Sequence, residues 1–244
     1  MKRELAMGVN AVSGLLDVAP ERIVRVWLNP SSDRLARLGR DLSASGITVE
    51  HCDVRALDRR AEGVRHQGVI AEFRPREPMN ESELGDLLAQ AQQPLLLVLD
   101  GVSDPHNLGA CIRSAAAAGA CGVVVPKDRA AGLTPVTRRA AAGASERLPL
   151  VVVTNLARTL RLLGESGVWR VGLAGEAQST LYEADFTGPA AVVMGSEERG
   201  LRRLTRENCD QLVRIPMPGA VESLNVSVAA GVALFEAVRS RGDL

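Results

Sequence analysis

The first of three short blocks that could form a reactive site is DPHNLGACIRSAAAAGA, at 104–120. It places Asn107 where a helix can start, after an Asp-Pro turn, and Arg113 six residues later on an alanine-rich helix. A guanidinium stays protonated, and its planar set of donors matches phosphate and carboxylate oxygens. Arg113 is therefore a candidate for binding a phosphate or stabilising a developing oxyanion. The structural alternative is a surface salt bridge, because arginine is mostly exposed.

The other two blocks combine polar side chains with glycine and apolar residues. MGSEERGL, at 194–201, brings a serine and two glutamates to a predicted helix start, where capping would explain them. IPMPGAVESLNVSVAAGVALFE, at 215–236, puts Ser223 and Asn225 at the mouth of a segment that is apolar on nearly every side. A buried polar group without a partner costs about 1–3 kcal/mol. These two residues must therefore cap the helix or hold something.

The three blocks follow apolar runs that predict buried strands. Continuous apolar runs are typical of a parallel sheet covered by helices on both faces. The predicted strands of this region are 95–100, 122–126, 148–153, 168–173, 189–195 and 211–216. Ligands of such sheets bind beyond the carboxyl ends of the strands, where the three blocks lie. The sequence contains neither a GxGxxG nor a GxxxxGK[ST] motif, which disfavours a nicotinamide or nucleoside triphosphate site.

The N-terminal region is predicted to form a separate, smaller α/β unit. Its predicted strands are 23–28, 47–51 and 68–73, and its predicted helices are 8–18, 31–45 and 53–62. A stretch with two prolines and several charges follows, and Asn80 or Ser82 is predicted to start a short helix that ends before Pro94. The sequence therefore predicts a first domain at 1–75, a linker with a short helix at 76–93 and a second domain at 94–244.

Charge and composition limit the possible partners. The net charge is zero, and it divides into +2 for residues 1–75 and −2 for the rest, so neither part shows the basic footprint of a nucleic-acid-binding domain. The stretches 55–65 and 201–206 could form local basic patches, although the first also fits a solvated helix face. Three Phe, two Trp and one Tyr offer little for base stacking, so recognition of RNA would use backbone, arginine and shape.

The cysteines and the chain start indicate a cytoplasmic protein. Cys52, Cys111, Cys121 and Cys209 show no CxxC spacing, which argues against a zinc site and predicts reduced, mostly buried thiols. The start, MKRELAMGVN, has no apolar stretch of a signal peptide, and no run approaches the roughly 18 apolar residues of a membrane span. We therefore expect no metal and no membrane partner.

Together the three blocks resemble the three motifs of the SpoU (TrmH) family of RNA ribose 2′-O-methyltransferases, in the SPOUT superfamily, and the match covers nearly all of 95–240. MGVNAVSGLL at 7–16 and EGVRHQGVIAEF at 62–73 look like the small RNA-binding domain, similar to ribosomal protein L30e, of several members. The resemblance implies an α/β fold in which an L30e-like domain precedes a parallel-sheet SPOUT domain with a deep trefoil knot. It also implies a homodimer, because family members pair through the knot region and both chains complete each site.

The resemblance also implies an activity. Family members transfer a methyl group from S-adenosylmethionine to a ribose 2′-hydroxyl of RNA, and no DNA is involved. The members most similar to this sequence act on a guanosine in the peptidyl-transferase loop of bacterial 23S rRNA; tRNA or another rRNA site is the alternative. By their match to the family motifs, Gly195, Ile215 and Leu224 are expected to hold the cofactor through backbone atoms. The expected catalytic residues are Arg113, Asn107, Glu198, Ser223 and Asn225.

Each expected catalytic residue has a role and an alternative. Arg113 would bind the adjacent phosphate and stabilise the oxyanion, since arginine is a poor proton acceptor. Asn107 would orient Arg113 or the ribose, or else cap its helix. Glu198 would contact RNA or cap a helix. Ser223 and Asn225 would face the reacting ribose or hold their loop shut.

Two other classes of protein remain open on the sequence. The chain could be a catalytically silent RNA-binding relative, although the joint presence of Arg113, Asn107 and the Ser-Leu-Asn step disfavours this. It could also be a small-molecule α/β enzyme that binds an adenosyl ligand, but the N-terminal domain and its RHQG segment at 65–68 would then have no role. His66 in that segment is predicted to be a packing histidine with satisfied hydrogen bonds.

Overall fold

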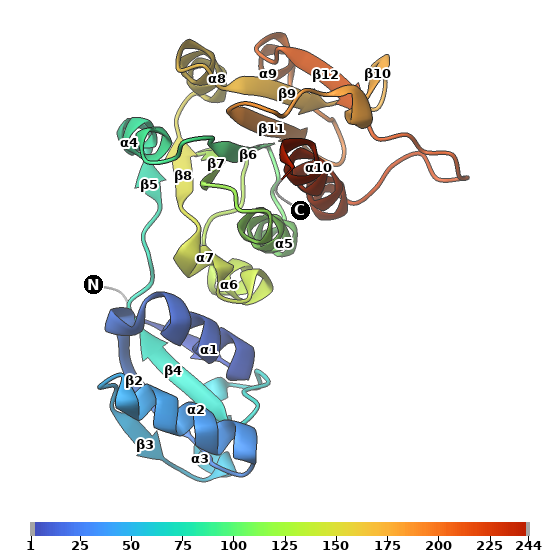
Figure 1. Cartoon of the computed structure of the whole chain (residues 1–244). Helices are drawn as coiled ribbons and strands as arrows, with labels where there is room; N and C mark the ends of the chain where they lie inside the picture. Colours follow the sequence, from blue (N-terminus) through green and yellow to red (C-terminus); the bar gives the residue numbers. More distant parts are fainter. Residues whose placement is uncertain (1–2, 243–244) are drawn as a thin grey trace. The chain divides into compact units, whose positions relative to one another are not determined.

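Two β-sheets organise the chain, one in each of two units that the computed structural model contains (Figure 1). The structure describes residues 3–242. The first unit extends to Glu77 and also takes in Ala142–Arg147, and the second comprises Pro78–Ala141 and the chain from Leu148 onward.

The sheet of the first unit has four strands in the order β1-β4-β2-β3. Strand β4 runs antiparallel to both β1 and β2, and β3 runs parallel to β2. Its elements are β1 (Glu4–Met7), α1 (Val9–Val18), a 3-10 turn (Pro20–Arg22), β2 (Ile23–Leu28), α2 (Asp33–Ala44), β3 (Val49–His51), α3 (Val54–Ala61), β4 (Val69–Phe73) and the later helix α7 (Ala144–Arg147). Ser32 caps α2 by accepting a hydrogen bond from the Leu35 amide. The predicted small α/β unit is confirmed, and the short strand β1 is an addition to it.

The sheet of the second unit has eight strands in the order β10-β12-β9-β11-β6-β7-β8-β5, and every neighbouring pair is parallel. Its strands are β5 (Met79–Asn80), β6 (Leu95–Asp100), β7 (Gly122–Pro126), β8 (Leu150–Val153), β9 (Trp169–Leu173), β10 (Ser179–Thr180), β11 (Ala190–Gly195) and β12 (Gln211–Arg214). All six predicted strands are present. The two-residue edge strands β5 and β10 were not predicted.

Helices cover both faces of this parallel sheet, which is why its central strands β6, β7, β8 and β11 are apolar over nearly their whole length. The helices are α4 (Leu84–Ala89), α5 (Pro105–Ala117), α6 (Pro135–Ala141), α8 (Leu156–Glu165), α9 (Arg203–Glu207) and α10 (Val226–Arg241), with 3-10 turns at Glu81–Glu83 and Leu181–Glu183. Residues of α4 and α8 form one core with alternate residues of the central strands. Helix α10 packs against α5, and α5 against α6 (Figure 1). All of β6 is buried.

All four cysteines are free thiols. Cys111 is fully buried, and burial raises the pKa of Cys111 and of Cys209 to about 12. Burial also raises the pKa of Cys121. A thiol with a raised pKa is a poor nucleophile at neutral pH, which agrees with the structural role predicted for Cys111, Cys121 and Cys209. Within residues 3–242, no cluster of His, Cys, Asp or Glu side chains could hold a metal ion. No helix in the same range has both the length and the apolar character to cross a bilayer.

Candidate active site at the carboxyl edge of the sheet

The loops that carry the three sequence blocks leave the sheet at the carboxyl ends of β6, β11 and β12. Strands β6 and β11 are neighbours in register, with Asp100 opposite Gly195 at their ends. Strand β12 lies one strand further, beyond β9. Parallel strands deliver their following loops to one edge, so residues that are far apart in sequence meet there.

A cluster of three side chains joins the three blocks. Asn107 Nδ2 donates to Glu197 Oε1 at 2.6 Å, and Asn225 Nδ2 donates to the same oxygen at 3.2 Å. Asn225 Nδ2 also donates to Asn107 Oδ1 at 3.0 Å. One carboxylate thus orients two amide side chains from different loops, since a carboxylate accepts hydrogen bonds and cannot donate them. We call these three residues the amide–carboxylate cluster.

Asn107 is available for this cluster because another residue caps its helix. Asp104 is the N-cap of α5, and its Oδ1 accepts a hydrogen bond from the His106 amide at 2.9 Å. Pro105 follows as the first helical residue, where its missing N–H costs nothing. The alternative that Asn107 caps the helix is therefore wrong, and the structure shows no hydrogen bond from Asn107 to Arg113 within residues 3–242.

Asn225 performs both of the roles that the sequence left open. Its Oδ1 accepts from the Ser227 amide at 2.9 Å and from the Ser227 hydroxyl at 2.6 Å, which caps α10. Its Nδ2 faces the other way, into the amide–carboxylate cluster. Ser223 is exposed on the loop before the helix and forms no hydrogen bond within the described chain.

The second block forms a tight turn, so the predicted helix start at SEERGL is wrong. The backbones of Ser196 and Gly200 exchange two hydrogen bonds, of 3.2 and 2.9 Å. The next helix, α9, begins only at Arg203 and has no side-chain cap. This turn aims Glu197 at the cluster.

The turn is close enough to the end of β11 to demand glycine there. A Cβ on Gly195 would lie 2.0 Å from the carbonyl carbon of Gly200 and 2.3 Å from the Leu201 nitrogen. Both are backbone atoms, so no side-chain adjustment could make room. Gly195 therefore lets the chain fold back over its own strand end.

Arg113 and Glu198 lie outside the cluster. Both are exposed, and neither forms a hydrogen bond or ion pair within residues 3–242. Glu197, which does form the cluster, was not among the catalytic residues predicted from sequence. The pattern offered two adjacent glutamates, and the geometry of the turn decides which of them points at Asn107.

The positions expected to hold an adenosyl cofactor line one edge of the sheet. Gly195 ends β11, half-buried Ile215 follows β12 directly, and half-buried Leu224 lies just before α10. Within the described chain, no backbone N–H or C=O between 215 and 224 forms a hydrogen bond. Free backbone groups beside apolar side chains suit a ligand with a flat, polar-edged ring. The residues present therefore fit the cofactor.

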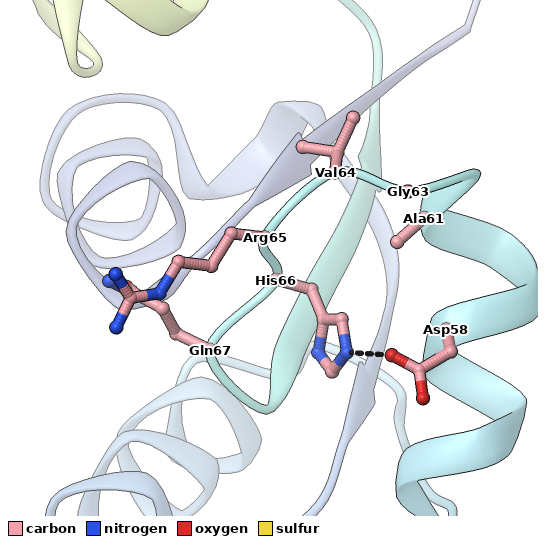
Figure 2. A pocket seen from close by; sticks show the side chains of 7 residues that line it. All are labelled: Asp58, Ala61, Gly63, Val64, Arg65, His66 and Gln67. Carbon is pink, nitrogen blue, oxygen red and sulfur yellow. Dashed lines mark hydrogen bonds and ion pairs between the residues drawn. The ribbon is translucent and has the colours of Figure 1, made fainter.

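His66 lies in the first unit and has a structural role, as predicted. Its Nδ1 accepts from the Gly68 amide at 3.0 Å, so Nε2 carries the proton and donates to Asp58 Oδ1 at 2.9 Å. His66 and Asp58 help to line a pocket of about 460 Å³. Figure 2 shows the hydrogen-bonded pair, with Arg65 pointing away from Asp58. Both ring nitrogens are thus hydrogen-bonded within the first unit.

A family model and a solved structure identify the second unit as an α/β methyltransferase domain of the SpoU type. The chain belongs to the SpoU rRNA Methylase family, whose model matches residues 94–235. A second model, RNA 2′-O ribose methyltransferase substrate binding, matches residues 5–79.

Named relatives align over the whole chain. The 23S rRNA (guanosine-2′-O-)-methyltransferase RlmB of Vibrio cholerae is 54% identical over 243 residues, which are 99% of this chain and 98% of the relative. RlmB of Haemophilus influenzae is 53% identical over 241 residues, 98% of each. Among solved structures, the SpoU methyltransferase AviRb from Streptomyces viridochromogenes, in complex with AdoMet, superposes with a TM-score of 0.78 at 26% identity and covers 99% of this chain and 92% of its own.

Proposed function

We propose that this protein methylates the ribose 2′-hydroxyl of a guanosine in the peptidyl-transferase loop of 23S rRNA. The observation that carries the proposal is the amide–carboxylate cluster, which joins all three motif loops beside Gly195. The full-length identity with RlmB proteins supports the choice of a 23S rRNA guanosine. With rRNA as its substrate, the protein works in the cytoplasm, and RNA, not DNA, is its partner.

The residues of the chain align the reacting groups and stabilise the charge that develops on the ribose oxygen. Gly195, Ile215 and Leu224 would hold S-adenosylmethionine, which would supply an electrophilic methyl group. A ribose hydroxyl is a poor nucleophile at neutral pH, so the protein must orient it and favour the developing alkoxide. Arg113 binds the neighbouring phosphate and stabilises that charge. Asn107 and Asn225, fixed by Glu197, hold the ribose and the loop before α10, and Ser223 faces the ribose from that loop.

The direct test is to map methylation in rRNA. Mass spectrometry of 23S rRNA from a strain that lacks the gene should show one unmethylated guanosine in the peptidyl-transferase loop. Addition of the purified protein and S-adenosylmethionine to that RNA should restore the methyl group. A methyl group that appears on tRNA or at another rRNA position would contradict the proposed target, and no methylation at all would favour a silent RNA-binding relative.

The two adjacent glutamates provide a matched pair of variants. Glu197→Ala should lower the single-turnover rate of methylation by about ten- to a hundredfold, because both amides lose the carboxylate that orients them. Glu198→Ala removes the same charge from an exposed position and should leave the rate near that of the wild type. Rapid-quench methylation assays on both variants check this. Equal losses of rate would contradict an orienting role for Glu197 alone. A larger loss for Glu198→Ala would assign that role to Glu198.

The protein is further proposed to act as a homodimer that pairs through α10 and α5. Val228 and Phe235, seven residues apart on one face of α10, are 51% and 44% exposed, whereas Ala230, Leu234 and Ala237 of the same helix are fully buried. Arg113 on the adjacent α5 is exposed without a partner within the described chain. A second copy would cover the apolar face and bring its Arg113 to the site.

Sedimentation tests this assembly. We expect a dimer at micromolar concentration in analytical ultracentrifugation, and Phe235→Glu should shift it toward monomer, because a charge is costly to bury in an interface. Leu162→Glu is the control, since Leu162 on α8 is also 44% exposed but lies on another helix. A monomeric wild type, or equal effects of the two variants, would refute the arrangement.

A further inference from the structure

A second cavity opens at the carboxyl ends of β7 and β8. Its volume is about 570 Å³, and three segments enclose most of it: the loop after β7 with Arg129, the start of α8 with Asn155, and the 202–205 stretch with Arg202 and Arg203. This last stretch belongs to one of the two basic patches that the sequence suggested. None of the proposed cofactor-binding residues lines the cavity.

Arg202 is held in place by a buried acid. Asp100, which is 1% exposed, accepts hydrogen bonds from the Arg202 amide at 3.0 Å and from Arg202 Nε. The arginine side chain is itself 44% exposed. Asp100 contacts the guanidinium of Arg202 through Nε, so the two terminal nitrogens of the guanidinium remain available to an anion. The buried carboxylate thus fixes the position of a cation at the cavity wall.

Two more arginines bring positive charge to the same cavity. Arg129 is exposed and forms no ion pair within the described chain, and its backbone adopts a left-handed φ of 60°. Arg203 pairs only with Glu207, in an exposed i,i+4 contact of little strength. Asp128 also lines the cavity and offsets one charge. Asp100, Asp128 and Glu207 balance the three arginines in formal charge, so what the cavity offers an anion is the side chain of Arg129 and the terminal nitrogens of Arg202.

The start of α8 adds backbone donors to these cations. Asn155 caps the helix by accepting from the Arg158 amide at 3.0 Å, and Leu156 and Ala157, the first two helical residues, line the cavity. The first amides of a helix have no partner within it, and they carry the positive end of the helix dipole. Helix amides and arginine side chains from two other loops therefore face one space, an arrangement suited to phosphate.

We propose that this cavity binds a phosphodiester of the RNA strand that flanks the methylated nucleotide. The inference rests on the proposed function and names a contact surface for its substrate. Its loops adjoin the active site, because a Cβ built on Gly101 would lie 3.8 Å from both the Arg129 carbonyl oxygen and the Ser196 Cβ, next to Glu197. An RNA strand that leaves the amide–carboxylate cluster along these loops would bring the phosphates of its next nucleotides to the cavity.

The test measures RNA binding as a function of salt concentration. Neutralisation of phosphates releases counterions, so log K falls with log salt by about 0.7 per phosphate for a single strand. The double variant Arg129→Ala/Arg203→Ala should raise the Kd for an unmodified 23S rRNA fragment about tenfold near physiological salt and reduce the slope by about one to two contacts. Lysine at both positions should restore the slope, because the charge returns. Affinity for S-adenosylmethionine should not change.

Arg139→Ala/Arg161→Ala is the matched control. Both are exposed arginines outside the cavity lining, on α6 and α8, so their loss removes the same two charges without touching the proposed site. If the double variant and the control change the Kd and the salt slope alike, the inference is wrong. Binding is measured apart from methylation, which separates the two claims. If the wild-type protein binds RNA through these arginines but transfers no methyl group, only the proposed function is contradicted. If methylation is normal and the double variant leaves the salt slope unchanged, only this inference is contradicted.

Discussion

Arg113→Ala is expected to lower the single-turnover rate of methylation by about 10²–10³-fold, the usual effect of removing one donor that stabilises an oxyanion. Affinity for S-adenosylmethionine should stay nearly unchanged. Arg113 lies on α5, whereas the proposed cofactor positions Gly195, Ile215 and Leu224 lie on the loops after β11 and β12. Arg113→Lys should recover only part of the rate, because an ammonium keeps the charge but loses the planar two-pronged geometry.

Calorimetry of S-adenosylmethionine binding and single-turnover methylation, run on the wild type and both Arg113 variants, check this expectation. Arg139→Ala is a suitable control, since Arg139 is an exposed arginine on the neighbouring helix α6. If Arg113→Ala binds cofactor normally and still methylates within a few-fold of the control, Arg113 is a surface arginine and the catalytic assignment is wrong.

Gly195→Ala should abolish detectable binding of S-adenosylmethionine and lower methylation by about a hundredfold or more. The added Cβ would lie 2.0 Å from the Gly200 carbonyl carbon, so the 196–200 turn must move away from the end of β11. That movement displaces Glu197 from Asn107 and Asn225 and distorts the backbone that we propose for the cofactor. Overpacking of this kind also costs about 1–3 kcal/mol of stability, so the variant should unfold at a lower temperature.

Gly175→Ala controls for the general cost of replacing a loop glycine. Gly175 follows β9 near the same edge of the sheet, and a Cβ there would meet nothing within 4 Å. Calorimetry and thermal unfolding of the two variants should therefore diverge. Normal cofactor binding by Gly195→Ala would show that the turn can shift without cost, and the proposed cofactor cradle would need another position.

The architecture of the catalytic unit could be predicted because its strands are long, continuous apolar runs between helical stretches. A strand such as Leu95–Asp100, buried on both faces, has no other stable place in a globular chain. The short strands β1, β5 and β10 escaped prediction, since their two to four residues carry no readable period. Strands β3, β8 and β12 are also short, but each lies within a longer run that the sequence predicts as a strand. The trefoil knot and the homodimer stay predictions from the family resemblance.

Some side chains of the candidate site could likewise be predicted from the sequence, and others could not. Asn107, Arg113, Ser223 and Asn225 could be named from residue type and motif, because polar residues in apolar or alanine-rich segments need a reason to be there. The sequence did not show that Glu197, rather than Glu198, joins the cluster. It also did not show that Asp104 caps α5 and so leaves the Asn107 side chain to the cluster. Both depend on local backbone geometry, a tight turn in one case and the first turn of α5 in the other.

By itself, the sequence determined the class of fold, the family and the groups that each loop offers, because these follow from local pattern and composition. Only the tertiary structure decided which groups meet. Asn107 is separated from Glu197 by 90 residues and from Asn225 by 118, and no local preference relates them. The parallel pairing of β6 with β11, and of β9 with both β11 and β12, brings their loops to one edge, and there a single carboxylate orients both amides.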